Sequence, residues 1–128
     1  MLMALATRAW TLAELDRLPD DGNKYELVEG ELFVTPAPSP AHERLSSVLY
    51  SILLPYVRKE RLGDIYTPRA VVRTNGSEVE PDLMVRPHVS TVPETWEQMP
   101  TPSLVVEILS QTTRRRDQDH KRRFYQRI

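Results

Sequence analysis

The chain of 128 residues contains no cysteine and four glycines. The lack of cysteine excludes disulfide bonds and cysteine-ligated zinc or iron–sulfur sites, and it fits a reducing cytoplasm, in which we expect the protein to act. The sequence has no glycine loop that cradles phosphates, no zinc signature and no Ser/His/Asp pattern. No apolar run approaches the ~20 residues that a membrane span needs, and residues 1–6 are too short for a signal peptide. We therefore expect no membrane contact.

What the chain does contain is an ordinary globular composition, with 40% apolar and 27% charged residues, which predicts a single domain over 1–128. The net charge is −1, but residues 114–127 hold seven basic and two acidic side chains, a surplus of five positive charges. This asymmetry favours a polyanionic partner, because Lys and Arg release counterions from phosphates. A solvated helix face with scattered charge is the alternative interpretation.

Local signals predict the elements of the N-terminal part. A capping-box pattern that begins at Thr11 predicts a short helix. The segments 24–28 and 31–35 flank Glu29-Gly30, which predicts a hairpin with a two-residue turn.

A long helix is predicted over 39–59, because Ser39 is a suitable N-cap and Pro40 occupies the first helical position. Pro55 is expected to kink or end this helix. Helical spacing predicts that its buried face consists of six residues: Leu45, Val48, Leu49, Ile52, Leu53 and Tyr56.

After Gly63 the pattern changes to that of strands. The predicted strands are 64–67, 70–73, 79–85 and 104–109. The last of these is a continuous apolar run, which is typical of a central strand covered on both faces. Residues 86–102 hold four prolines and predict a loop with one short helical turn, and a polar helix is expected at 114–127.

Two carboxylates stand within these predicted strands, Asp82 and Glu107. Because burying an unpaired carboxylate is costly, each either faces solvent or belongs to a site that uses its charge. Acids on two neighbouring strands, followed by a basic helix that contains lysine, indicate metal-dependent cleavage of phosphodiesters. The alternatives are a turn aspartate after a proline for Asp82 and a solvent-facing strand position for Glu107.

Several segments, taken in order, match one known family. They are Tyr25-Glu26-Leu27-Val28-Glu29-Gly30-Glu31-Leu32, Pro38-Ser39-Pro40-Ala41-His42, Glu80-Pro81-Asp82-Leu83, Leu104-Val105-Val106-Glu107-Ile108-Leu109-Ser110, and Thr113-Arg114-Arg115-Arg116-Asp117 with Lys121 and Tyr125. In this series the chain resembles the Uma-two-type restriction endonucleases, a bacterial branch of the PD-(D/E)XK nuclease superfamily, from about Trp10 to Ile128. The resemblance implies a restriction-endonuclease-like α/β fold, a mixed sheet with the helix 39–59 on one face and the basic helix at the other side.

The resemblance also implies a metal site. Asp82 and Glu107 would be carboxylate ligands of Mg²⁺ or Mn²⁺, with the backbone carbonyl of Ile108 as a third ligand. The superfamily places a lysine two residues after the second acid, where this chain has Leu109, and Lys121 in the following helix is expected to replace it. That lysine would orient water or stabilise the transition state, unless it is an ordinary surface lysine.

Three further residues are candidates by resemblance. Glu26 is expected near the metal, His42 is expected to face the site, and Glu80 is a further acid on the side of Asp82 if the strand is regular. The alternatives are a surface strand glutamate for Glu26 and an exposed position in the first turn of a helix for His42. His88 and His120 show no ligand spacing.

We therefore expect a hydrolase, a Mg²⁺- or Mn²⁺-dependent DNA endonuclease that acts as a homodimer. Family members continue past the basic helix into further strands, so we expect a C-terminally truncated domain with an open edge beside 104–109. One alternative is a catalytically inactive or truncated nuclease-fold module that binds nucleic acid or a protein partner. Another is an unrelated small-molecule-binding α/β domain, which would show no salt-dependent affinity for DNA.

Overall fold

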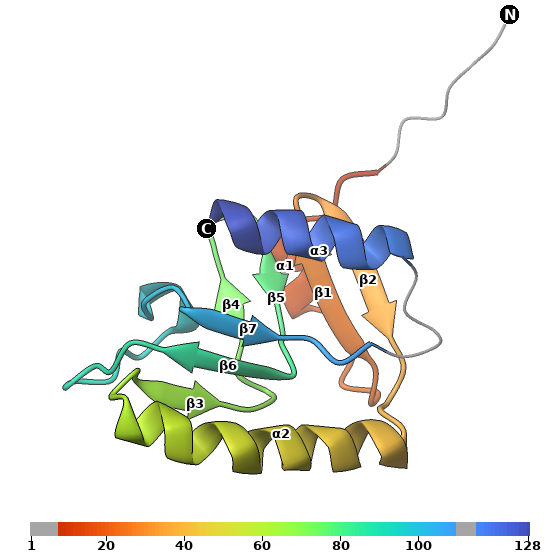
Figure 1. Cartoon of the computed structure of the whole chain (residues 1–128). Coiled ribbons are helices and arrows are strands. Elements are labelled where there is room, and N and C mark those ends of the chain that lie inside the picture. The colour runs from red at the N-terminus through yellow and green to blue at the C-terminus, as the bar shows by residue number, and fades with distance from the viewer. Residues whose placement is uncertain (1–7, 110–114) are drawn as a thin grey trace, which may run out of the picture.

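The computed structural model describes residues 8–109 and 115–128, which form two antiparallel sheets and three α-helices (Figure 1). The elements in chain order are α1 (Leu12–Asp16), β1 (Lys24–Val28), β2 (Glu31–Thr35), α2 (Pro40–Lys59), β3 (Asp64–Tyr66), β4 (Val72–Arg73), β5 (Glu78–Val79), β6 (Leu83–Arg86), the 3₁₀ turn η1 (Trp96–Gln98), β7 (Leu104–Val106) and α3 (Arg115–Arg127). The expected helices, hairpin and helical turn are confirmed in these positions.

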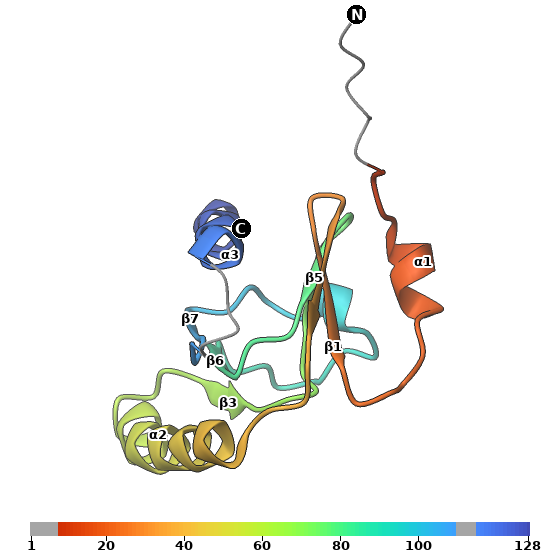
Figure 2. The same ribbon diagram turned by 90° about the vertical axis from the view of Figure 1, so that its right-hand side faces the viewer.

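The strands divide between two sheets. Sheet A has the order β2-β1-β5-β4, sheet B has the order β3-β6-β7, and all pairs within them are antiparallel. Helix α1 lies on one face of sheet A, and α3 lies on the side that faces sheet B (Figure 2). Helix α2 runs along sheet B on the side away from α3 (Figure 1). The expected α/β class is confirmed, although the strands form two antiparallel sheets instead of one mixed sheet.

The hairpin turn and the N-terminal caps of α1 and α2 have the geometry that their sequences predict. Glu29 and Gly30 both have positive φ, 50° and 85°, as the central residues of a type I′ hairpin turn must. Thr11 and Glu14 form a complete capping box at α1. The hydroxyl of Ser39 accepts a hydrogen bond from the backbone N–H of His42 at 3.2 Å, which caps α2.

The hydrophobic core lies between sheet A, sheet B and α3. It is one cluster of buried residues from β1, β2, the segment 70–79, β6 and α3: Val28, Phe33, Ala70, Val72, Val79, Met84 and Phe124. Tyr66, Val105 and Tyr125 pack against its margin. Because α3 contributes Phe124 to this core, the polar helix is held against the sheets. Other side chains of α3 can therefore reach the space between sheet A and sheet B.

The prediction for the buried face of α2 is wrong. Leu45, Val48, Ile52 and Tyr56 are between 46% and 64% exposed, and Val57 is the buried residue of this helix. A helix of 20 residues is about 30 Å long, whereas sheet B offers three short strands to cover it. The helix therefore places only its Val57 edge, with Leu49 and Leu53 half-buried, against the sheet.

The prediction for Pro55 is also wrong in part, because α2 continues past it to Lys59. Pro55 and Ser51 are both exposed, so the Ser51 carbonyl that loses its intrahelical donor can bind water instead.

The predicted strand 79–85 is broken into two strands of different sheets. β5 ends at Val79 in sheet A and β6 begins at Leu83 in sheet B. The buried Pro81 lies between them, and a proline has no N–H to continue a ladder. The chain therefore crosses from one sheet to the other at residues 80–82, which carries Asp82 to the junction of the two sheets.

The run 104–109 is not a central strand. Within the described part of the chain β7 covers only Leu104–Val106 and pairs with β6 alone. Leu104 is 43% exposed. The apolar run indicated burial on both faces, but its outer edge has no neighbouring strand among the described residues.

Candidate active site

Asp82 and Glu107 converge where β6 and β7 meet. The two strands pair with Leu83 opposite Val106, and the same register continued by one residue places Asp82 opposite Glu107, on one face of the sheet. Asp82 is buried, and its Oδ2 accepts a hydrogen bond from the backbone N–H of Ile108 at 2.6 Å. This hydrogen bond joins Asp82 to the residue that follows Glu107.

His42 reaches the same carboxylate from the first turn of α2. Its Nε2 lies 3.1 Å from Oδ1 of Asp82, and its Nδ1 lies 3.3 Å from Oε1 of Glu43. The cap at Ser39 fixes the turn that carries the imidazole. The structure thus places His42 in the site, and not at an exposed position with a merely local role.

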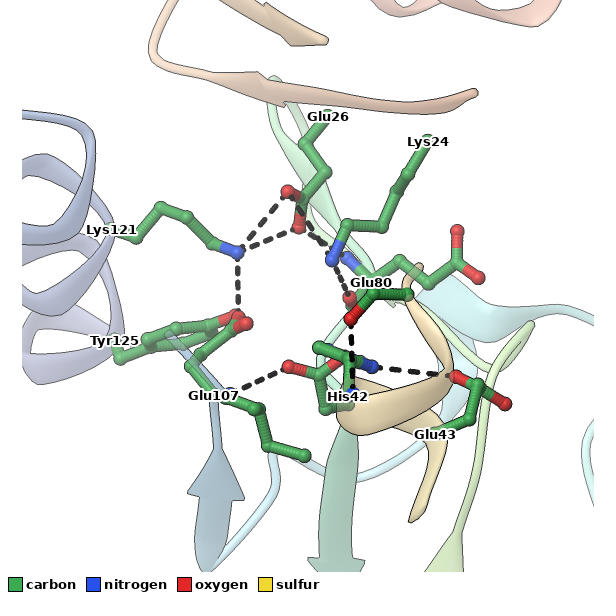
Figure 3. Close-up of polar contacts among 11 residues, drawn as sticks. Lys24, Glu26, His42, Glu43, Glu80, Glu107, Lys121 and Tyr125 are labelled. Atoms are coloured by element: carbon green, nitrogen blue, oxygen red, sulfur yellow. Dashed lines mark hydrogen bonds and ion pairs between the residues drawn. The ribbon is translucent and has the colours of Figure 1, made fainter. Parts of the chain in front are cut away.

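Lys121 joins Glu107 to a further acid, Glu26. Its Nζ lies 3.1 and 2.9 Å from the two carboxylate oxygens of Glu26 and 2.6 Å from Oε1 of Glu107 (Figure 3). Tyr125, one helical turn later on α3, donates its hydroxyl hydrogen to the same Oε1 at 2.6 Å. The residues Glu26, Glu107, Lys121 and Tyr125 are called the lysine cluster below.

Burial controls the protonation of this cluster. Burial raises the pKa of Glu107, and the nearby Lys121 ammonium opposes that rise. Burial alone would lower the pKa of Lys121, but the attraction of Glu26 and Glu107 outweighs it and the pKa is raised. Burial, with the charge of Glu107, raises the pKa of Tyr125 well above its ordinary value. At neutral pH Lys121 is therefore a cation and Tyr125 a hydrogen-bond donor.

Glu80 contributes to the site through its backbone. Its N–H donates to Oε2 of Glu26 at 2.8 Å, and its carbonyl accepts from Nζ of Lys24 at 3.2 Å. Burial raises the pKa of the Glu80 side chain. Lys24 also lies 3.9 Å from Oε1 of Glu26. Sequence reasoning missed Lys24, although the alternation of β1 puts it on the same face as Glu26.

Tyr125 belonged to the family pattern but had no role assigned to it. Its position four residues after Lys121 was the available signal, because residues at that spacing share a helix face. Leu109, in the position of the superfamily's lysine, is 60% exposed. The described contact of Ile108 is through its N–H, and the role of its carbonyl as a metal ligand stays a prediction.

Helix α3 presents basic residues to solvent beside the site. Arg122 and Arg123 are exposed. His120 lies 3.0 Å from Oε2 of Glu31 and packs edge-on against Phe33, with 5.6 Å between ring centroids, so it docks the helix on the hairpin. Arg114 and the side chains of residues 115–117 lie outside the described part of the chain.

Two adjoining cavities open at the site. The larger, of about 730 Å³, extends towards Tyr50 and Arg69. The smaller, of about 400 Å³, extends beneath α3 and is lined by the lysine cluster. The residues common to both linings are Lys24, Thr35, Pro36, His42 and Asp82. We call this shared boundary the waist.

The donor set fits a hard divalent cation that takes few protein ligands. Within residues 8–109 and 115–128 no group of three or more His, Asp or Glu side chains is arranged to hold a metal ion. Mg²⁺, however, commonly binds through one or two carboxylates and keeps several waters. Asp82 and Glu107 are two carboxylates of this kind beside open cavities.

Comparison with known proteins identifies the family of this chain. The model of the family Uma2, described as "Putative restriction endonuclease", matches residues 12–128. The chain belongs to the Uma2 family. A crystal structure of a protein described as a putative nuclease of the DUF820 family, from Anabaena variabilis, superposes with a TM-score of 0.72 at 20% identity, over 91% of this chain and 67% of that chain. The search of curated proteins found no match.

Membership of the Uma2 family supports a nuclease. The likeness to the Anabaena variabilis protein establishes the fold alone, because the two chains are identical at only 20% of the aligned residues. Among the described residues, the helices of this Uma2 protein include none with the length and apolar character needed to cross a membrane.

Proposed function

We propose that this Uma2 protein is a Mg²⁺- or Mn²⁺-dependent endonuclease that hydrolyses phosphodiester bonds of DNA. The observation that carries the proposal is the convergence of Asp82 and Glu107 at the β6–β7 pair, where Ile108 donates to Asp82. Asp82 is buried and Glu107 is half-buried, and both line a cavity, where perturbed acids often serve a function. The family supports the nuclease, and the acids support its dependence on a metal.

Asp82, Glu107 and the carbonyl of Ile108 are the groups that would hold the cation. When bound, the cation lowers the pKa of a water and offsets charge on the phosphate. His42 holds Asp82 in position through Nε2. Lys121 offsets the charge of Glu107 and Glu26, so the acids can lie close together before substrate arrives.

The exposed arginines of α3 are the proposed DNA contacts outside the cavities. Arg122 and Arg123 are exposed on α3, the helix that supplies Lys121 and Tyr125, and Arg122 also lines the smaller cavity at its margin. Cationic side chains bind phosphates by releasing counterions, so affinity should fall steeply as salt rises. An affinity that does not change with salt would favour the unrelated small-molecule domain.

Cleavage of plasmid and duplex oligonucleotides in Mg²⁺ and Mn²⁺ tests this proposal. Asp82→Ala and Glu107→Ala should each lower the rate at least ~100-fold, because each removes a charged ligand. Glu94→Ala, which changes an exposed acid in the loop before η1, should cut at the parental rate. Circular dichroism would show that the variants fold. A folded Glu107→Ala variant as active as the parent would exclude the assignment.

A second candidate is a nuclease-fold module that binds nucleic acid or a protein without turnover. It is favoured by the position of Lys121, whose ammonium already contacts three carboxylate oxygens of Glu26 and Glu107. Calorimetric titration with Mn²⁺ separates the two candidates. A nuclease should bind the ion in a manner that depends on Asp82, whereas a binding module should retain salt-dependent DNA affinity without it.

Further parts of the proposal concern assembly and context. The outer edge of β7 and the exposed apolar residues of α2 support a homodimer that covers one of these surfaces. Sedimentation of a stable monomer would remove this part. We also propose that residues 1–128 form one domain and that the protein acts in the bacterial cytoplasm.

A further inference from the structure

The waist is the place where a substrate strand that occupies both cavities has to pass. Lys24, Thr35, Pro36, His42 and Asp82 line both cavities. A nucleic acid strand is continuous, so a phosphate between two nucleotides in the two cavities would lie at this boundary. The proposed metal ligand Asp82 lines the same boundary, so a phosphate at the waist would lie beside it.

Two lysines lie near this position, and they differ in how far their charge is already used. Nζ of Lys121 contacts both oxygens of Glu26 and one of Glu107 within 3.1 Å. An ammonium group has three N–H donors, so these contacts can occupy all of them. Lys121 is therefore suited to hold the acids in place.

Lys24 is engaged less fully. It donates to the carbonyl of Glu80 at 3.2 Å, and its distance of 3.9 Å from Oε1 of Glu26 is too long for a hydrogen bond. Its side chain is 22% exposed, against 13% for Lys121. Lys24 lines both cavities, whereas Lys121 lines the smaller one.

We infer that Lys24 is the lysine that contacts the phosphate to be cleaved at the waist, and that Lys121 positions Glu26 and Glu107. This inference rests on the proposed nuclease function. In hydrolysis the oxygen of a water forms a bond to phosphorus, one ester P–O bond breaks, the departing oxygen gains a proton and the attacking water loses one. Lys24 takes no part in these proton transfers, and its ammonium group offsets the charge that grows on the non-bridging phosphate oxygens.

Substitution of the chain's lysines tests the division of roles in the full chain. The sequence has three lysines, and the exposed Lys59 at the end of α2 supplies the control. Single-turnover cleavage in Mn²⁺ should fall about 100-fold in Lys24→Gln, recover in part in Lys24→Arg, and stay unchanged in Lys59→Gln. Mn²⁺ affinity of Lys24→Gln, measured by calorimetry without DNA, should stay within about threefold of the parent.

A binding measurement without turnover gives a second readout. With Ca²⁺ in place of Mn²⁺, the slope of log affinity for a duplex oligonucleotide against log salt should decrease by about 0.9 in Lys24→Gln, the value for one lost phosphate contact. An active parent with a fully active Lys24→Gln, or an unchanged slope, would overturn the assignment of Lys24 alone. A parent that neither cuts nor binds DNA would overturn the proposed function and this assignment together.

Discussion

The two sides of the candidate site hold their buried carboxylates with different kinds of partner. On one side, Asp82 is held by the N–H of Ile108 and by Nε2 of His42. On the other, in the lysine cluster, two carboxylates share a permanent cation, with distances from Lys121 of 2.6 to 3.1 Å. The first side contributes a carboxylate held by dipoles and an imidazole, and the second contributes an ion-paired group.

This difference in partners indicates which side of the site binds a metal ion and which side stabilises the fold. The described partners of Asp82 are an N–H and an imidazole and include no Lys or Arg side chain, so we expect a metal ion to gain most at Asp82. Carboxylates bridged by a lysine are already compensated, and the loss of the lysine would leave two buried negative charges. We therefore expect substitutions of Lys121 and Tyr125 to act mainly on folding and substitutions of Asp82 and His42 to act mainly on metal binding.

Removal of the shared cation should produce the largest effect on stability. Lys121→Met leaves Glu26 and Glu107 without their common partner and should lower the free energy of unfolding by about 3–5 kcal/mol. Adding Glu26→Gln should restore part of this loss, because one of the two charges is then absent. Urea denaturation measures both variants. A Lys121→Met protein as stable as the parent would show that the cluster does not hold the fold together.

A smaller loss is expected from the hydroxyl that shares Oε1 of Glu107. Tyr125→Phe removes the 2.6 Å hydrogen bond to this oxygen while Lys121 still contacts it, so the cost should be about 1–2 kcal/mol. Tyr56→Phe is the matched control, because Tyr56 is 58% exposed on α2. Equal unfolding midpoints for the two variants would contradict a stabilising role of the Tyr125 hydroxyl.

The same cluster predicts how stability changes in alkali. The folded pKa values of Lys121 and Tyr125 are raised above their ordinary values of 10.5 and 10.0. Above pH 10 the unfolded chain therefore loses these protons first, and the free energy of unfolding falls as pH rises. Below pH 10 their contribution is fully present. Denaturation from pH 8 to 11.5 should show a smaller fall in Tyr125→Phe than in the parent, and an equal fall would contradict the raised pKa.

The sequence predicts the local features of this fold better than the pairing of distant segments. The hairpin turn at Glu29-Gly30 depends on neighbouring residues, and it is found as expected. The division of 79–85 at Pro81 and the edge position of β7 depend on which strands pair across the molecule. Periodicity along one segment carries no information about that choice. The exposed apolar face of α2 was missed for the same reason.

The candidate site shows the same limit. Resemblance indicated Glu26, His42, Glu107 and Lys121 as residues of one site, and the structure brings them to one pair of cavities. It did not indicate which residue contacts which. The bridge from Lys121 to both acids joins β1, the end of β7 and α3, and such contacts follow from tertiary packing, not from spacing in the sequence.

A substitution on the Asp82 side should change stability least. Its main effect should be on metal binding. His42→Ala removes the contact at Oδ1 while the N–H of Ile108 still holds Oδ2, so the unfolding free energy should change by about 1 kcal/mol. A group that orients a metal ligand typically changes affinity at least about tenfold, so Mn²⁺ binding should weaken clearly. His88→Ala is the control, because His88 contacts Asp64 on the surface with 71% of its side chain exposed. If calorimetry found equal Mn²⁺ affinity in both variants, Asp82 would not depend on its imidazole and the two sides of the site would differ less than their contacts indicate.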